Sequence, residues 1–249
     1  MGDLCDYRTY HLSAAEWAKH FLTAAGAAGA AAYVFYRSLP VFIGFLPLAA
    51  LWPFYLRRRL GEQRRETLRL QFKEGILALA SALESGYSVE NAFAASLADI
   101  RDMYGEDGMI TREFSYIVQQ LRMNRTVESL LSGFAARSGV EEIENFAEIF
   151  AVSKRSRGGV GSVIAHVTRV ISQKIEVREE IRNMTAEKQF EQRIMNMIPF
   201  FIVIYVDSTS PGFFDCMYTT VIGRIVMTAC LGVYLVSLAL AGHFLRIEI

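Results

Sequence analysis

Proline is scarce in this chain and is confined to its two ends. None of the five prolines lies between Leu56 and Pro199. The intervening chain therefore lacks the residue that most strongly interrupts a helix. It also lacks the alternation of apolar and polar residues that is typical of half-buried strands. Both absences argue against a β-sheet domain and favour helices.

Charge is scarce at both ends as well. Residues 57–193 hold 21 of the 26 Lys and Arg and 20 of the 26 Asp and Glu, so the net charge of zero hides a sharp partition. The three longest segments without any Asp, Glu, Lys or Arg are 20–36, 38–56 and 225–245. Each approaches the roughly 20 apolar residues with which a helix spans a bilayer. The sequence therefore predicts a charged domain, 57–193, between two transmembrane hairpins, 20–56 and 194–249.

The third span, which begins at Ile194, is the least clear of the four. Only residues 194–206 are uncharged before the polar run Asp207-Ser-Thr-Ser210. A re-entrant or interfacial segment is the alternative, because thirteen residues fall within the range of such helices. Pro199 in this segment, like the three prolines of the second span, predicts a kink.

The basic residues next to the apolar segments indicate the orientation. Arg57 to Arg59 directly follow the second segment, whereas the turn between the first two contains only Arg37. Because Lys and Arg accumulate on the cytoplasmic side, the charged domain and both termini are predicted to be cytoplasmic. Cys5 would then be cytoplasmic, Cys216 would lie in the outer turn and Cys230 within a span, so we expect no intrachain disulfide.

Residues that carry chemistry are few. The four histidines are scattered, without a partner at ligand spacing or a His-Glu-x-x-His arrangement. Gly158-Gly-Val-Gly161 lacks the Lys-Ser or Lys-Thr of a phosphate loop and is interpreted as a turn between helices. Glu141, Glu142 and Glu144 are interpreted as a solvated helix face rather than a cation site. We expect no catalytic residue, no metal, no cofactor and no enzymatic activity.

Apolar residues within 57–193 recur at helical spacing in six runs. The runs lie in 72–83, 89–104, 114–121, 127–134, 143–150 and 160–181. Each stripe must be buried against another helix, so the sequence predicts an all-α bundle of six helices. No proline or glycine lies between Ser162 and Ile198, which predicts one helix of about 50 Å that leads into the third span.

Polar residues and glycines mark the expected helix ends. Gly86 is suited to end the first helix, and Ser88 to cap the second. Thr126 is expected to cap the fourth helix. Ser138 with Glu141 three residues later predicts a capping box at the start of the fifth.

Several stretches resemble a known family. They are Leu83-Glu-Ser-Gly-Tyr-Ser-Val-Glu-Asn-Ala-Phe93, residues 158–171, Met197-Ile-Pro-Phe200, Ser210-Pro-Gly-Phe213, Thr220-Val-Ile-Gly223 and Ala241-Gly-His-Phe-Leu-Arg246. In this order they resemble the type II secretion system F domain family, and most of all its TadB and TadC proteins of the tight-adherence (Flp) pilus. The resemblance runs from about Leu68 to the C-terminus and leaves the tail 1–19 without an assigned role.

The resemblance implies a multi-pass platform protein of the cytoplasmic (inner) membrane, without a catalytic centre. Its helical domain is expected to contact a hexameric secretion or pilus ATPase, and its membrane part to engage pilin subunits in the lipid bilayer. The resemblance also implies a paralogous partner, as in the TadB/TadC pair, and homo- or hetero-oligomeric assembly. No nucleic acid is expected as a partner. The expected function is to couple the ATPase to pilin assembly or protein export.

Two sets of residues are candidates for these roles. The basic side chains expected to contact the ATPase are Arg57, Arg58, Arg59, Lys154, Arg155 and Arg157. The first three are equally suited to anchoring the chain on anionic lipid headgroups. Glu187, Pro199 and Pro211 mark the helix expected to transmit force and its kinks.

Two other classes of protein remain as alternatives. A membrane-anchored signalling or scaffold protein would also present a helical bundle, but a sensor kinase would need a phosphoacceptor His followed by an ATP-binding domain. A small transporter is disfavoured because ionisable residues are nearly absent from the expected spans, where His243 is the exception.

Overall fold

The computed structural model describes residues 6–9, 14–37, 39–155 and 160–244, and these residues form helices and connecting turns without a strand. The predicted all-α fold is therefore confirmed. The chain divides into two compact units. The first unit contains Met1–His11 and Arg57–Arg178, and the second contains Leu12–Leu56 and Glu179–Ile249. Helices α2 (Leu39–Glu84) and α7 (Val160–Thr209) each supply residues to both units.

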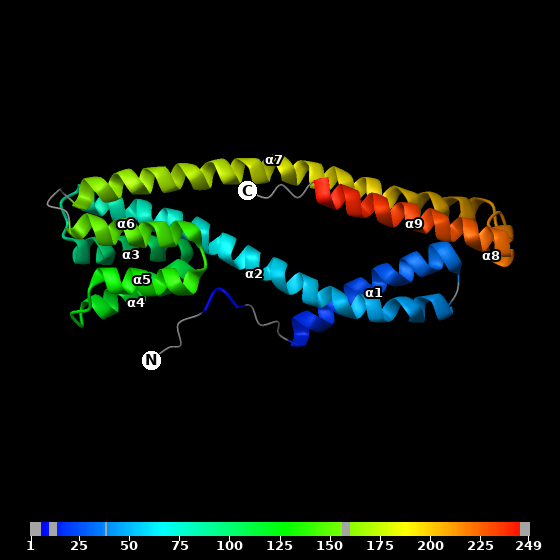
Figure 1. Ribbon diagram of the computed structural model, residues 1–249, viewed down its shortest axis with the longest axis horizontal. Helices are drawn as coiled ribbons and strands as arrows, with labels where there is room; N and C mark the ends of the chain where they lie inside the picture. Colours follow the sequence, from blue (N-terminus) through cyan, green and yellow to red (C-terminus); the bar gives the residue numbers. More distant parts are fainter. Residues whose placement is uncertain (1–5, 10–13, 38, 156–159, 245–249) are drawn as a thin grey trace. The chain divides into compact units, whose positions relative to one another are not determined.

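The first unit is a bundle of helices (Figure 1). The C-terminal part of α2 and the N-terminal part of α7 join four shorter helices: α3 (Val89–Tyr104), α4 (Met109–Leu121), α5 (Val127–Ser138) and α6 (Glu141–Arg155). All six predicted helical runs are thus confirmed. Helix α6 ends at Arg155 and α7 begins at Val160. Of the predicted turn Gly158-Gly-Val-Gly161, the two glycines at 158 and 159 lie outside the described residues, and Val160 and Gly161 belong to α7.

Phenylalanine rings dominate the core of this bundle. Phe72 of α2 packs edge-on against Phe134 of α5 and Phe146 of α6, at ring centroid distances of 6.2 and 5.6 Å. Phe93 of α3 contacts Phe114 of α4 at 5.4 Å. These five rings are at most 1% exposed. Such pairs each contribute about 0.5–1.5 kcal/mol beyond their buried area.

The helix ends confirm some expected caps and correct one. Gly86 adopts a φ of 88° after α2, and the Asn91 N–H donates to Ser88 Oγ at 3.4 Å. Thr126 precedes α5, but its side chain makes no capping hydrogen bond. The capping box is wrong, because Ser138 is the last residue of α5 and its Oγ accepts from the Val140 N–H at 3.2 Å. The left-handed Gly139 separates it from α6, and Glu141 pairs with Lys174 instead of reaching back.

The N-terminal segment packs on the bundle, a contact that no pattern in the sequence predicted. Tyr7 is only 3% exposed and belongs to the core of the first unit. Its backbone N–H donates to the Arg137 carbonyl at 3.0 Å, and the Arg64 guanidinium lies 5.1 Å from its ring centroid. Arg8 adds an ion pair with Glu144 at 3.6 Å. Part of the unassigned tail is therefore part of the bundle.

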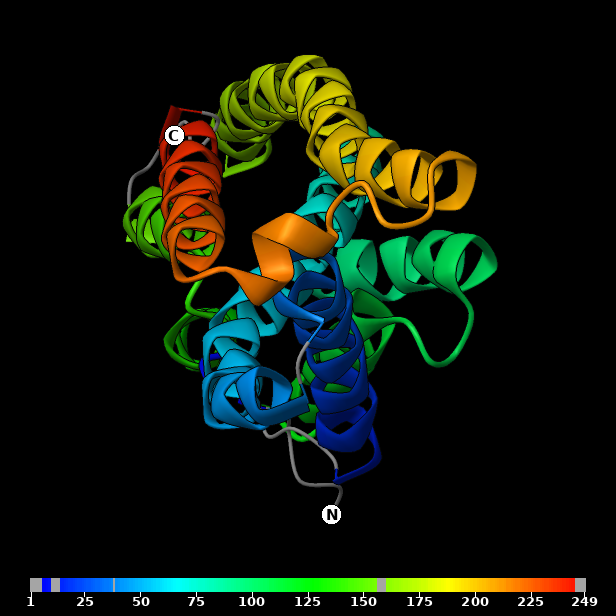
Figure 2. The same ribbon diagram turned by 90° about the vertical axis from the view of Figure 1, so that its right-hand side faces the viewer.

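The second unit combines α1 (Ala14–Tyr36) with the first part of α2, the last part of α7, and two further helices. Figure 2 shows the short α8 (Asp215–Thr219) between the end of α7 and the start of α9 (Val221–Phe244). Tyr36 Oη lies 2.9 Å from Thr228 Oγ1, which joins α1 to α9. The Tyr234 hydroxyl of α9 donates to the Asn196 carbonyl of α7 at 2.9 Å.

The turn from α8 into α9 depends on a glycine. A Cβ on Gly223 would lie 2.5 Å from both the Cα and the carbonyl oxygen of Met217. A real Cβ does not approach a backbone so closely, so only glycine fits this position.

One helix of the described part of the chain, α9, is long and apolar enough to cross a membrane, through residues Val221–Ala241. The other three expected spans remain predictions, and most side chains of 38–56 lie outside the described residues. Helix α7 continues through Pro199 and past Asp207 to Thr209.

Two glycine positions test the packing of the bundle. A Cβ on Gly75 of α2 would lie 3.2 Å from both Ile110 Cγ1 and Phe114 Cζ of α4, whereas one on Gly133 of α5 would meet only Arg137 Nη1 at 3.6 Å. Gly75→Val should lower the free energy of unfolding by about 1–3 kcal/mol through overpacking. Gly133→Ala should raise it by up to about 1 kcal/mol through helix propensity. Urea unfolding of the detergent-solubilised chain measures both, and equal effects would contradict a close α2–α4 contact.

Candidate functional site

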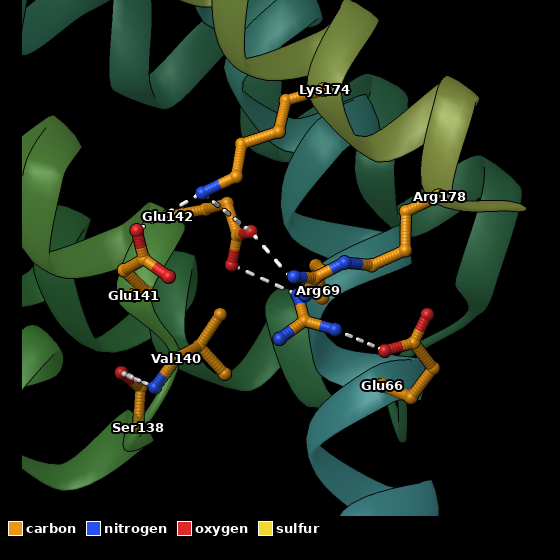
Figure 3. A network of polar contacts seen from close by, with 8 residues as sticks. All are labelled: Glu66, Arg69, Ser138, Val140, Glu141, Glu142, Lys174 and Arg178. Atoms are coloured by element: carbon orange, nitrogen blue, oxygen red, sulfur yellow. Dashed lines mark hydrogen bonds and ion pairs between the residues drawn. The ribbon is translucent and has the colours of Figure 1, made fainter. Parts of the chain in front are cut away.

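A buried carboxylate connects three helices of the first unit. Glu142, in the first turn of α6, is 1% exposed. Its Oε2 accepts from Arg69 Nε of α2 at 2.9 Å. Its Oε1 lies 3.5 Å from Lys174 Nζ and 3.6 Å from Arg178 Nη1, both on α7 (Figure 3). One acidic side chain thus joins α6 to α2 and α7, the two longest helices.

The surrounding residues hold this cluster in place. Arg69 also pairs with Glu66 one turn earlier on α2, and Lys174 Nζ lies 3.0 Å from Glu141 Oε1 (Figure 3). The hydrogen bond from Val140 to Ser138 orders the turn that leads into α6. The unpaired amides and the dipole at a helix N-terminus also favour a carboxylate in the first turn.

Nearby charges and hydrogen bonds affect the pKa of Glu142 more than its burial does. Burial alone would raise the pKa of its carboxyl, but its own backbone amide, Arg69 and Lys174 together hold the pKa below its ordinary value. Glu142 is therefore ionised at neutral pH. The interpretation of 141, 142 and 144 as a solvated face is wrong for Glu142, whereas Glu141 and Glu144 are 63% and 46% exposed.

The sequence does contain an indication of this cluster: some charged residues occupy positions on the apolar stripes of their helices. Glu142 lies four residues before the buried Phe146 and so continues its stripe. Arg69 stands three residues before the buried Phe72, and Arg178 three residues after the buried Ile175. Charges of opposite sign at stripe positions of different helices indicate a buried ion pair.

A second buried carboxylate behaves differently. Glu113 of α4 is 2% exposed at its side chain and lies 2.8 Å from Arg137 Nη2 of α5. Burial raises the pKa of Glu113, and the opposing effects of Arg137 and of a hydrogen bond with Tyr7 compensate only in part. The N-terminal segment therefore contributes a polar partner as well as a ring.

Of the basic residues predicted to contact an ATPase, those whose side chains are described do not form one surface. Arg57, Arg58 and Arg59 are exposed on α2, and Lys154 is exposed on α6, 3.0 Å from Glu128 Oε2 of α5. The pairs Arg69–Glu142 and Phe72–Phe146 show that α2 and α6 run in the same direction. At 1.5 Å per residue the two sets lie roughly 35 Å apart along the bundle. The side chain of Arg155 and all of Arg157 lie outside the described residues.

The residues predicted to mark force transmission are all placed in the second unit. Glu187 and Pro199 are exposed on α7, and Pro211 is exposed in the turn before α8. No break in α7 occurs at Pro199.

The structure adds a groove that the sequence did not indicate. A groove of about 500 Å³ runs between α3 and α4. Leu97 and Val118 contribute to its apolar lining, and Ala94 and Ala98 keep it open on the α3 side. Arg101 and Arg122 line it near the C-terminal ends of the two helices.

Neither a metal centre nor a known relative defines the site. Among the described residues, no three His, Cys, Asp or Glu side chains are grouped so that they could hold a metal ion. No family model, no curated protein and no solved structure matches this chain.

The Glu142 cluster is tested by removing its charge. Glu142→Gln leaves three cations around a neutral amide and should lower the free energy of unfolding by roughly 3 kcal/mol at pH 7. The matched control, Glu144→Gln, removes a half-exposed pair and should cost less than about 1 kcal/mol. Urea unfolding of the detergent-solubilised chain measures both variants.

The same pair of proteins gives a pH test. The pKa of Glu142 is lowered in the folded chain, so its contribution is present above the unfolded value of about 4.3 and is lost as the pH falls through the folded value. The stability difference between the wild type and Glu142→Gln should therefore be largest above about pH 5 and shrink on acidification. A difference that grows toward pH 4 would contradict the lowered pKa.

Proposed function

We propose that the chain is a multi-pass platform protein of the cytoplasmic membrane that couples a secretion ATPase to the assembly of a Flp-type pilus or to protein export. One observation carries the proposal. Helices α2 and α7 both begin or end among the expected membrane segments, both supply residues to the charged bundle, and both are fastened there to Glu142. Such an arrangement suits a protein that passes movement from a soluble motor into the membrane.

The N-terminal segment supports the expected hairpin at 20–56. Tyr7 is buried among residues of the bundle, so residues 6–9 and the bundle share one side of any membrane. The chain between them, which includes α1 and the start of α2, would then cross twice or not at all. Two crossings agree with the uncharged segments 20–36 and 38–56 and with cytoplasmic termini.

The proposed partners suit exposed parts of the chain. Arg57–Arg59 are suited to anionic lipid headgroups beside the membrane. Lys154, which Arg155 and Arg157 follow in the sequence, is suited to the ATPase, because it lies at the opposite end of the bundle from Arg57–Arg59. The exposed apolar side chains of α9, such as Val221, Ile225 and Val233, suit lipid or pilin subunits. A paralogous platform protein would complete the assembly.

A membrane-anchored helical scaffold or signalling protein remains the second candidate, since a bundle joined to membrane helices serves it equally well. The two functions differ in their genetic setting and in the phenotype of a deletion. Genes for a secretion ATPase and for small prepilins beside this gene, together with loss of filaments on its deletion, would support the platform function. Normal filaments in the deletion strain would exclude it.

The native cysteine of α8 allows a test of the orientation. Cys216 is exposed, and the proposal places it outside the cytoplasmic membrane. In a background with Cys5 and Cys230 changed to Ser, a membrane-impermeant maleimide should label Cys216 in intact spheroplasts. Lys154→Cys, in a chain that also carries Cys216→Ser, should be labelled only after lysis. Labelling of both from the same side would contradict the proposed topology.

Force transmission through α7 is tested by interrupting that helix. A Gly-Pro insertion after Glu187 removes backbone hydrogen bonds in an uninterrupted helix and should abolish filament assembly while the protein still inserts into the membrane. The same insertion after Glu106, in the exposed turn between α3 and α4, is the matched control and should have little effect. Filament counts by electron microscopy and carbonate extraction of membranes are the measurements. Normal filaments with the Glu187 insertion would show that an unbroken α7 is unnecessary.

A further inference from the structure

Arg37 occupies an unusual backbone position in the second unit. It lies in the turn between α1 and α2 with a φ of 42°, in the left-handed region that non-glycine residues rarely adopt. A residue is held in that region when its surroundings supply enough interactions to offset the cost of the strained backbone. The contacts of the side chain supply them.

The Arg37 guanidinium contacts three helices. It forms an ion pair with Asp207, near the end of α7, and its Nη1 lies 3.8 Å from Asp215 Oδ1 at the start of α8. Its Cζ lies 5.9 Å from the ring centroid of Tyr33 on α1 and 5.4 Å from that of Tyr218 on α8. A planar guanidinium can satisfy carboxylates at its edge and aromatic rings at its faces together, which a lysine ammonium cannot.

Two further bonds reinforce the same junction. The Tyr218 hydroxyl donates to the Val34 carbonyl of α1 at 2.6 Å, which places α8 beside the end of α1 (Figure 2). Arg224 Nε donates to the Tyr218 carbonyl at 3.1 Å. Tyr218 is therefore held from both sides while its ring faces Arg37.

We propose that Arg37 is a latch that fastens the α1–α2 turn to the end of α7 and to α8. Its side chain is 35% exposed and that of Asp207 is 24% exposed, so the ion pair alone would contribute little, and the combination with the two rings makes the latch. Resting on the function proposed above, the latch passes displacement of α7 to the α1–α2 pair, so that the two expected hairpins move as one.

Hydrogen exchange in the full chain, in detergent micelles, tests the latch itself. Arg37→Ala and Asp207→Ala should each speed amide exchange at the ends of α1 and α7 and in α8 by about fivefold or more. The increase in exchange rate in the double variant should be at least about twofold smaller than the product of the increases in the two single variants, because both substitutions remove the same interaction. Exchange in Arg37→Lys should be intermediate between the wild type and Arg37→Ala, since lysine keeps the charge and loses the stacking. Arg193→Ala, which removes an exposed charge elsewhere on α7, is the matched control. Unchanged exchange in Arg37→Ala, or effects that multiply fully, would overturn the latch.

Filament assembly tests the coupling role separately. If the wild-type gene restores filaments to a deletion strain, Arg37→Ala should reduce their number at least about tenfold at equal protein level, and Arg193→Ala should not. Full assembly with Arg37→Ala, despite faster exchange, would overturn the coupling role. If deletion of the gene leaves filaments unchanged, the proposed function fails and with it the coupling role, while the exchange result still decides the latch.

Discussion

The desolvation of Glu142 is the constraint on which the bundle depends. Removing water from a carboxylate costs several kcal/mol unless cations and hydrogen bonds replace it. Here the replacements are Arg69 on α2 and Lys174 and Arg178 on α7. A slide of one helix along another would leave this carboxylate without its cations. The charges therefore act together with packed rings, such as Phe72 against Phe146, in fixing the register of α2, α6 and α7.

Burial acts to raise the pKa of both buried carboxyls, but the net shifts are opposite because their surroundings differ in charge. Glu142 has three cations and a backbone amide, and its pKa is lowered, whereas Glu113 has one arginine and Tyr7, and its pKa is raised. Acid therefore weakens the contribution of Glu142 and relieves the cost of burying charge at Glu113. The N-terminal segment matters here, because without Tyr7 the Glu113 carboxyl would lose one of its few polar partners.

Much of the fold could be predicted from the sequence, and less of the site. Six apolar stripes, of which the first runs from Phe72 to Leu83, predicted the six helices of the bundle. They could do so because burial imposes the helical period directly on the residue pattern. Glu142 was misread because local charge density resembles a solvated face, and its burial depends on cations 73 and 32 residues away in the chain at Arg69 and Lys174. Tyr7 and Arg37 carry no periodic signal at all. Single residues whose partners are distant in sequence escape pattern reasoning, however regular the helices around them.

Helix α7 is held by ion pairs at two separate positions. In the first unit Lys174 and Arg178 bind Glu142, and in the second unit Asp207 binds Arg37. The division between the units falls inside the helix, after Arg178, so no loop at that point can absorb a displacement. Backbone hydrogen bonds continue from turn to turn, and a helix without an interior break transmits axial movement rather than dissipating it. The proposed coupling would therefore rest on charge pairs at separate positions on one continuous helix, because each pair resists sliding at its own site.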